Sequence, residues 1–135
     1  MVADILFVGL LIFAAICDVR TRLIENWTVL AILALAVGKL LYQPSEFLSL
    51  ILAFLSALPL LFLWLKGGLG GGDVKLIAVS LCYLGVGRLL PFWVIFMLGL
   101  VGLMLLCAMR NKRTMPLAPA IALAGTGALL IPRLF

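Results

Sequence analysis

The sequence contains no histidine, and this absence excludes Ser-His-Asp triads, Cys-His dyads and histidine-ligated metal sites. Its three cysteines, Cys17, Cys82 and Cys107, lie far apart and form no C-x-x-C pair, so we expect neither a zinc site nor a disulfide framework. Charge is also scarce, because only 11% of the residues are charged and only five of them are acidic. We therefore expect no metal and no cofactor, and the carboxylates remain as the main candidates for catalysis.

Apolar residues are abundant instead, at 67% of the 135 residues, and the mean hydropathy is +1.38. A soluble domain of this length cannot bury so much apolar surface. One crossing takes about 20 apolar residues, so the length allows roughly six spans. We predict an all-α, polytopic membrane helix bundle of about six transmembrane helices, forming one membrane-embedded domain over residues 1–135. The apolar runs are Ile5–Cys17, Trp27–Tyr42, Phe47–Leu65, Val74–Gly87, Pro91–Met109 and Leu117–Leu134.

The basic residues predict the orientation of the chain. Seven of the ten lysines and arginines lie in the first, third and fifth loops. Because such residues collect on the cytoplasmic side, we predict a multi-pass protein of the cytoplasmic membrane with both termini outside. The net charge of +5 then reflects orientation, and no nucleic-acid partner is expected. The seven residues are Arg20, Arg22, Lys66, Lys75, Arg110, Lys112 and Arg113; the others are Lys39, Arg88 and Arg133.

Two aspartates fall at the predicted cytoplasmic face, since Asp18 ends the first apolar run and Asp73 opens the fourth. Two close carboxylates share a proton, because repulsion raises the pKa of one of them. The ionised member can then activate a water, while the protonated member donates to a carbonyl oxygen. Five glycines within Gly67–Gly72 permit an irregular segment beside Asp73, which leaves space for an extended peptide.

Simpler interpretations of these residues remain open at this point. Asp73 can be a helix cap, since aspartate is a favoured capping residue. Asp18 can be a solvated loop residue that pairs with Arg20 or Arg22, and Lys75 can be a positively charged membrane anchor.

The last apolar run is rich in alanine and glycine, which let membrane helices approach closely. We predict that it packs inside the bundle, near the segments that carry the aspartates. Pro116 and Pro119 are expected to shape its cytoplasmic entry.

Three stretches, taken together and in this order, resemble the motifs of type IV prepilin peptidases. "GGLGGGDVKL" contains G-x-G-D at Gly70–Asp73, followed by Lys75 and a leucine. "DVRTRLIENW", from Asp18 to Trp27, resembles the first motif, in which an aspartate precedes I-P-N. "MPLAPAIALAG", from Met115 to Gly125, resembles the P-x-G-P stretch that opens the last span.

The resemblance implies an aspartyl endopeptidase in which Asp18 and Asp73 correspond to the catalytic pair. Such enzymes remove the short basic leader of prepilins at the cytoplasmic face, so the implied partners are a prepilin and membrane lipid. Other motif positions are implied to shape the site or to bind substrate. They are Gly70, Gly72, Lys75, Asn26, Pro116 and Pro119.

This sequence departs from the family pattern at two positions. Glu25 stands where the family has the proline of I-P-N, and Ala118 stands where it has the glycine of P-x-G-P. We interpret Glu25 as a solvated loop acid that matters little for catalysis.

The first loop, Asp18–Asn26, is too short for the cysteine-rich insertion of family members that also N-methylate pilins. The chain therefore resembles the short, cleavage-only form of tight-adherence (Flp) pilus systems, and the archaeal preflagellin peptidases remain an alternative.

Two other classes of function remain open. One is a small proton- or ion-coupled transporter that uses the two aspartates as carriers. Transporters more often have carboxylates near the midplane and internal repeats, and neither feature is evident here. The other is a non-catalytic membrane subunit of a pilus-assembly machine. Cleavage of a co-expressed prepilin separates all three.

Overall fold

A computed structural model describes residues 2–21, 24–42, 47–67, 70–109 and 116–131, and within these ranges the chain is all-α with no strand. Each α-helix overlaps one of the apolar runs, and one run contains two helices, so the predicted all-α class is confirmed. The elements are α1 (Val2–Thr21), α2 (Asn26–Tyr42), α3 (Phe47–Ser56), α4 (Leu58–Leu65), α5 (Gly71–Leu84), the 3-10 turn η2 (Val86–Arg88), α6 (Leu89–Met109) and α7 (Ala118–Leu130).

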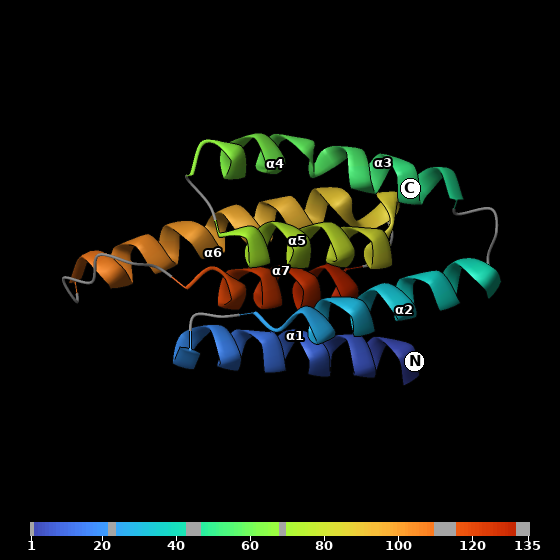
Figure 1. The fold of residues 1–135 in the computed structure, drawn as a ribbon, viewed down its shortest axis with the longest axis horizontal. Coiled ribbons are helices and arrows are strands. Elements are labelled where there is room, and N and C mark those ends of the chain that lie inside the picture. The colour runs from blue at the N-terminus through green and yellow to red at the C-terminus, as the bar shows by residue number, and fades with distance from the viewer. Residues whose placement is uncertain (1, 22–23, 43–46, 68–69, 110–115, 132–135) are drawn as a thin grey trace.

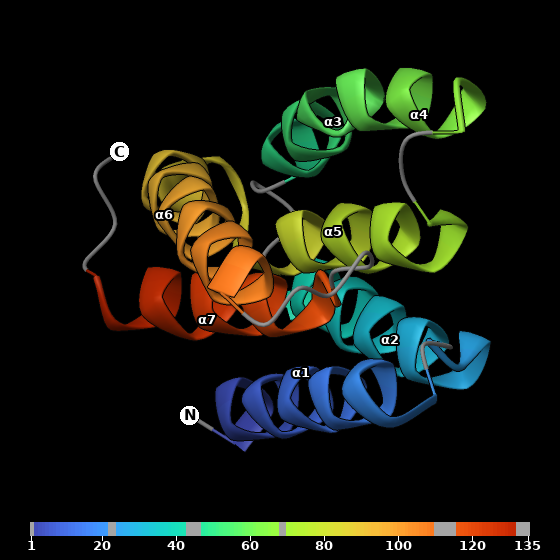
Figure 2. The ribbon, with the colours of Figure 1, turned by 90° about the vertical axis from the view of Figure 1, so that its left-hand side faces the viewer.

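The helices lie side by side and run alternately in opposite directions, with α3 and α4 continuing one another (Figure 1). One end of the bundle therefore gathers the end of α1 and the starts of α2, α5 and α7. The opposite end gathers the start of α1 and the ends of α2, α5 and α7. In Figure 2, α3 and α4 form an outer layer over α5.

The run Phe47–Leu65 forms two helices instead of the single helix predicted. α3 ends at Ser56 and α4 begins at Leu58, with Pro59 in its first turn. Proline has no N–H to donate, and its ring clashes with the carbonyl four residues earlier, so a continuous helix is interrupted here. Buried Ala57 lies at the junction.

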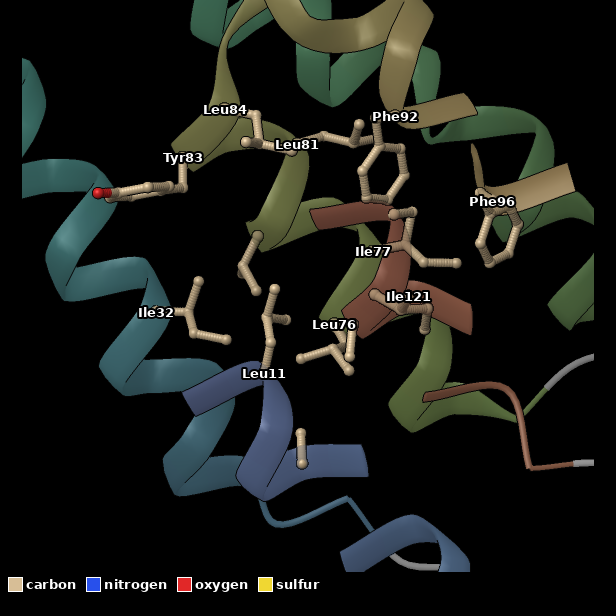
Figure 3. Close-up of a cluster of buried hydrophobic side chains, with 14 of the residues drawn as sticks. Leu11, Ile32, Leu76, Ile77, Leu81, Tyr83, Leu84, Phe92, Phe96 and Ile121 are labelled. Atoms are coloured by element: carbon tan, nitrogen blue, oxygen red, sulfur yellow. The ribbon is translucent and has the colours of Figure 1, made fainter. Parts of the chain in front are cut away.

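The core lies where α1, α2, α5 and α7 meet. Leu11, Ile32, Leu76 and Ile121 come from these four helices, are fully buried and lie close together in Figure 3. This arrangement brings together apolar side chains that are more than 100 residues apart in the sequence, and it fixes the mutual positions of the helix ends.

Helix α7 packs inside the bundle, against α1, α5 and α6, as its small residues predicted. At Gly125 a side chain would overlap Leu11 and contact Phe7, so glycine permits the close approach of α1 and α7. Five alanines of α7 are buried as well. They are Ala118, Ala120, Ala122, Ala124 and Ala128.

The outer surface is apolar, with large side chains such as Ile5 and Leu98 each 68% exposed. Two described stretches, Val2–Thr21 and Val86–Met109, are long and apolar enough to cross a membrane, while α2 and α7 are shorter apolar helices. The six-span topology therefore stays a prediction. Several charged residues used to predict orientation lie outside the described residues. They are Arg22, Arg110, Lys112, Arg113 and Arg133.

Candidate active site

Asp18 lies in the last turn of α1 and is only 7% exposed. Its Oδ2 accepts a hydrogen bond of 3.1 Å from the backbone N–H of Ala118, at the start of α7. The first N–H groups of a helix have no partner within the helix and favour a negative charge. The interpretation of Asp18 as a solvated loop residue is therefore wrong, because its carboxylate is buried and bound by a distant helix.

Asp73 lies in the first turn of α5. Gly70 occupies the capping position of this helix, and no side chain caps it. The Oδ1 atom of Asp73 is buried and has no hydrogen-bond partner among the described residues. The interpretation of Asp73 as a helix cap is therefore wrong. A buried carboxylate oxygen without a partner is energetically unfavourable and is characteristic of a site that receives a ligand.

The two carboxylates interact with each other. Asp73 precedes the apolar run Val74–Gly87, and its pKa is raised above the ordinary value first by burial and second by the charge of Asp18. The end of α1 and the start of α5 lie at the same end of the bundle (Figure 1), so the structure brings both sequence-predicted aspartates to that end. Such a pair holds a shared proton over a range of pH in which isolated aspartates are both ionised.

Gly70 allows the carboxylate of Asp73 to fold back over the start of its own helix. A Cβ atom at Gly70 would lie 2.9 Å from Oδ2 of Asp73, closer than real Cβ contacts. Gly70 has ordinary extended backbone angles, φ −69° and ψ 136°, which any residue can adopt. The glycine therefore leaves space for the carboxylate in this orientation, and it is not needed for an unusual backbone conformation.

The next two glycines bring other elements close to the same helix start. A Cβ atom at Gly71 would lie 3.0 Å from Nε1 of Trp64 in α4. A Cβ atom at Gly72 would lie 3.1 Å from the Cβ of Ile24, between α1 and α2. The glycine run thus lets α4 and the first connection close around Asp73. Trp64 and Ile24 were not found as site residues from the sequence, because nothing in their local patterns indicates these contacts.

Lys75 and Asn26 form a polar link at the edge of the site. The Nζ atom of Lys75 donates a hydrogen bond of 3.4 Å to Oδ1 of Asn26, joining α5 to the start of α2. Lys75 therefore does more than anchor the chain at a membrane surface.

Glu25 precedes Asn26 and is exposed, and its backbone carbonyl accepts a hydrogen bond of 3.0 Å from Thr28. The exposure of Glu25 agrees with the interpretation of a solvated acid.

A cavity of about 390 Å³ lies between α1 and α7, and Asp18 is not among the residues that line it. Val19 and Arg20 line it from the residues that follow Asp18, and Pro119 lines it from the first turn of α7. Pro116 is half-buried just before this helix. Apart from Arg20 the lining is apolar, so the cavity suits an apolar stretch of peptide or a lipid chain.

Two features of the site were not evident from the sequence. The N–H of Ala118 is a backbone group and leaves no side-chain signal, and the cavity depends on how α1 and α7 pack. Over the described part of the chain, no group of three or more potential metal ligands gathers at one place.

Comparisons with known proteins give one match. A family model described as the type IV leader peptidase family matches residues 5–108. The matched stretch includes Asp18, Asp73 and the glycine run. The search of curated proteins and the search of solved structures each find no match.

Proposed function

The chain belongs to the type IV leader peptidase family, a family of proteases, and from this membership we propose that it is a membrane aspartyl endopeptidase. Its proposed reaction is removal of the leader peptide from Flp-like type IV prepilins at the cytoplasmic face of the membrane. The observation that supports this best is the placement of two carboxylates at one end of the bundle, with Asp18 buried at the end of α1 and, at the start of α5, a buried oxygen of Asp73 that has no partner among the described residues.

The surroundings of the two aspartates favour different roles. The N–H of Ala118, at the start of a helix, stabilises negative charge on Asp18. Asp73 receives no comparable donor at Oδ1, and its raised pKa favours the protonated form. We therefore assign the general base to Asp18 and the proton donor to Asp73.

In the first step, Asp18 accepts a proton from a water whose oxygen attacks the scissile carbonyl carbon. Asp73 donates its proton to the carbonyl oxygen, so the tetrahedral intermediate is neutral and one proton stays on the pair. In the second step, Asp18 delivers its proton to the leaving nitrogen while the C–N bond breaks. The hydroxyl proton returns to Asp73, which restores the starting state.

The position of the pair supports a cytoplasmic site. Arg20, Lys66 and Lys75 lie at the same end of the bundle as the pair, and positive residues collect on the cytoplasmic side. The apolar cavity between α1 and α7, which Arg20 and Pro119 help to line, offers a place for the hydrophobic segment that follows a prepilin leader. Cleavage removes the leader and leaves this hydrophobic segment unchanged, so the product differs from the substrate only by the missing leader.

The test is cleavage of a co-expressed Flp-like prepilin by wild type, Asp18→Asn and Asp73→Asn. Each amide has nearly the shape of the acid but can neither accept nor supply the required proton, so we expect no leader removal by either variant. Glu25→Gln is the matched control, because it neutralises an exposed carboxylate of the same region. The amount of each variant in the membrane fraction is measured in parallel.

Different outcomes would contradict different parts of the proposal. Normal processing by Asp18→Asn or Asp73→Asn would remove that residue from catalysis. A loss in Glu25→Gln as complete as that in Asp18→Asn would mean that Glu25 is the partner of Asp73. An enzyme that leaves Flp-like prepilins intact but cleaves archaellin precursors would overturn the assigned substrate and leave the aspartyl mechanism standing.

A further inference from the structure

The cavity between α1 and α7 has a definite direction within the bundle. The two helices lie side by side and run in opposite directions, so the end of α1 meets the start of α7 (Figures 1 and 2). Val19 and Pro119 line the cavity at this end, whereas Ile12 and Leu123 line it near the middles of the two helices. The cavity is therefore a groove along the seam of the two helices, the α1–α7 groove. It follows about 10 Å of α1, from Val19 to Ile12.

The shape of the groove suits one face of an apolar helix. Ala15 is half-buried and Ala122 is buried, while Ile16 and Leu123 are exposed, so small side chains form the floor and large ones form the edges. A 10 Å length of a helix that is 10–12 Å across fills roughly 800–1,100 Å³. The groove of about 390 Å³ therefore holds one side of such a helix and leaves the other side to the surrounding lipid.

One end of the groove adjoins the candidate active site on both helices. Val19 follows Asp18 in α1, and Pro119 follows Ala118 in α7. The hydrogen bond of 3.1 Å between Asp18 and Ala118 holds these two positions together. A segment that occupies the groove therefore ends beside the carboxylate to which we assign the role of general base.

Arg20 marks the level at which the groove meets the membrane surface. It is exposed, and it is the one charged residue among the described residues that line the groove. Arginine side chains of membrane proteins lay their stems along apolar surface and place their charge at the level of the lipid head groups. A segment in the groove therefore has to be apolar beyond Arg20, and the polar residues that precede it belong on the side of Asp18.

We propose that the α1–α7 groove binds the apolar helix of the peptide substrate, with the start of that helix at Val19 and its later turns toward Ile12. This inference rests on the proposed peptidase function and adds the position and the direction of the substrate. From the end of the groove to the inward-facing carboxylate of Asp18, the peptide has to cover about one helix diameter, or about 10–12 Å. An extended chain covers this distance in about three or four residues. The scissile bond is therefore expected at that spacing before the residue held at Val19.

The test is photo-cross-linking in membranes with p-benzoylphenylalanine in place of Val19, Ile12 or Leu98. All three side chains are exposed, so the replacement leaves the core intact, and Leu98 on α6 is the control outside the groove. Each variant is combined with Asp73→Asn, so that a co-expressed Flp-like prepilin stays uncleaved, and is also made with Asp73 intact to measure cleavage. Mass spectrometry identifies the substrate residue that is attached.

We expect the probe at Val19 to attach to residues about three to five positions after the scissile bond. The probe at Ile12 should attach about seven residues later, because the two positions are about two helical turns apart. The probe at Leu98 should capture no substrate above background. This order distinguishes a docked helix from random collisions within the lipid.

A second measurement uses the purified enzyme and a variant that fills the groove. Ile16→Trp adds bulk at an exposed edge, so it should raise KM about fivefold, equivalent to about 1 kcal/mol of lost packing, and leave kcat unchanged. Leu98→Trp adds the same kind of side chain outside the groove and should leave both constants unchanged. A wild-type KM for Ile16→Trp would contradict docking in the groove.

The outcomes separate this inference from the proposed function. Cleavage without attachment of substrate at Val19 or Ile12 would overturn the groove as the docking site and leave the peptidase standing. Attachment of lipid alone at both positions, with cleavage intact, would assign the groove to an acyl chain and overturn the inference as well. Attachment in the reverse order would overturn the direction. Attachment in the expected order without cleavage by the intact aspartate pair would support the groove and contradict the proposed reaction.

Discussion

Replacing Gly70 by alanine tests whether the orientation of the Asp73 carboxylate matters for cleavage. The new Cβ would lie 2.9 Å from Oδ2 of Asp73, whereas ordinary contacts begin at 3.4 Å. The backbone at Gly70 does not have to change, because its φ of −69° and ψ of 136° suit alanine. The carboxylate, at the far end of a rotatable side chain, has to move instead.

The two distances set the size of the effect. The carboxylate must shift by about 0.5 Å, and a misplacement of about 1 Å can reduce catalysis roughly 100-fold. We therefore expect about tenfold slower cleavage by Gly70→Ala. Because glycine is preferred to alanine at a capping position, the free energy of unfolding should fall by about 1 kcal/mol.

The assay measures kcat and KM for a purified prepilin, together with the midpoint of thermal unfolding in the same detergent. The control is Gly102→Ala in α6, where a Cβ would meet nothing within 4 Å, and it should cleave as wild type does. A lower kcat with unchanged KM and a small change in midpoint supports the argument. Wild-type kcat for Gly70→Ala would refute it, since the carboxylate would then be free to adopt other orientations without loss.

Three further predictions concern pH, the first loop and packing. Because the charge of Asp18 raises the pKa of Asp73, Asp18→Asn should lower that pKa, which a carboxyl ¹³C NMR titration measures; an unchanged pKa would mean that the groups are not coupled. In wild type, the raised pKa keeps Asp73 protonated to higher pH, so cleavage should fall only above the pH at which an ordinary aspartate ionises. Glu25→Gln and Glu25→Pro should keep most activity and the pH optimum of wild type, measured as cleavage against pH; a shifted optimum would place Glu25 near the pair. Gly125→Ala should lower the free energy of unfolding by about 1–3 kcal/mol because its Cβ overlaps Leu11, measured by thermal unfolding; a stability equal to wild type would mean that α1 and α7 separate easily.

The helices were predictable from the sequence, because apolar runs bounded by charged residues, glycine and proline determine where helices begin and end. The division of the third run was missed, since a proline inside a long apolar run can also be accommodated by a kink. The packing of α7 followed from its alanines and glycines. The formation of a helix by an apolar run does not by itself show that the run crosses the membrane. Helix α5, for example, is short and largely buried within the bundle.

The aspartates could be picked out from their positions and motifs, but their surroundings could not. Asp18 is matched by a backbone N–H of Ala118, and such a group is present at every residue except proline, so no sequence pattern marks it. The glycines were expected to give freedom to the backbone. They were also expected to leave space for a peptide; in the structure the space at Gly70 is taken by the Asp73 carboxylate, which depends on where that side chain points.

The hydrogen bond between Asp18 and Ala118 has a consequence for biogenesis. The two residues are separated by 100 positions, so a ribosome working at about 5–20 residues per second makes Asp18 roughly 5–20 s before its partner. Throughout that interval α1 has to be accommodated by the insertion machinery with an unmatched carboxylate at its end. Docking of α7, and not the formation of α1, is then the event that gives the Asp18 carboxylate its hydrogen-bond donor.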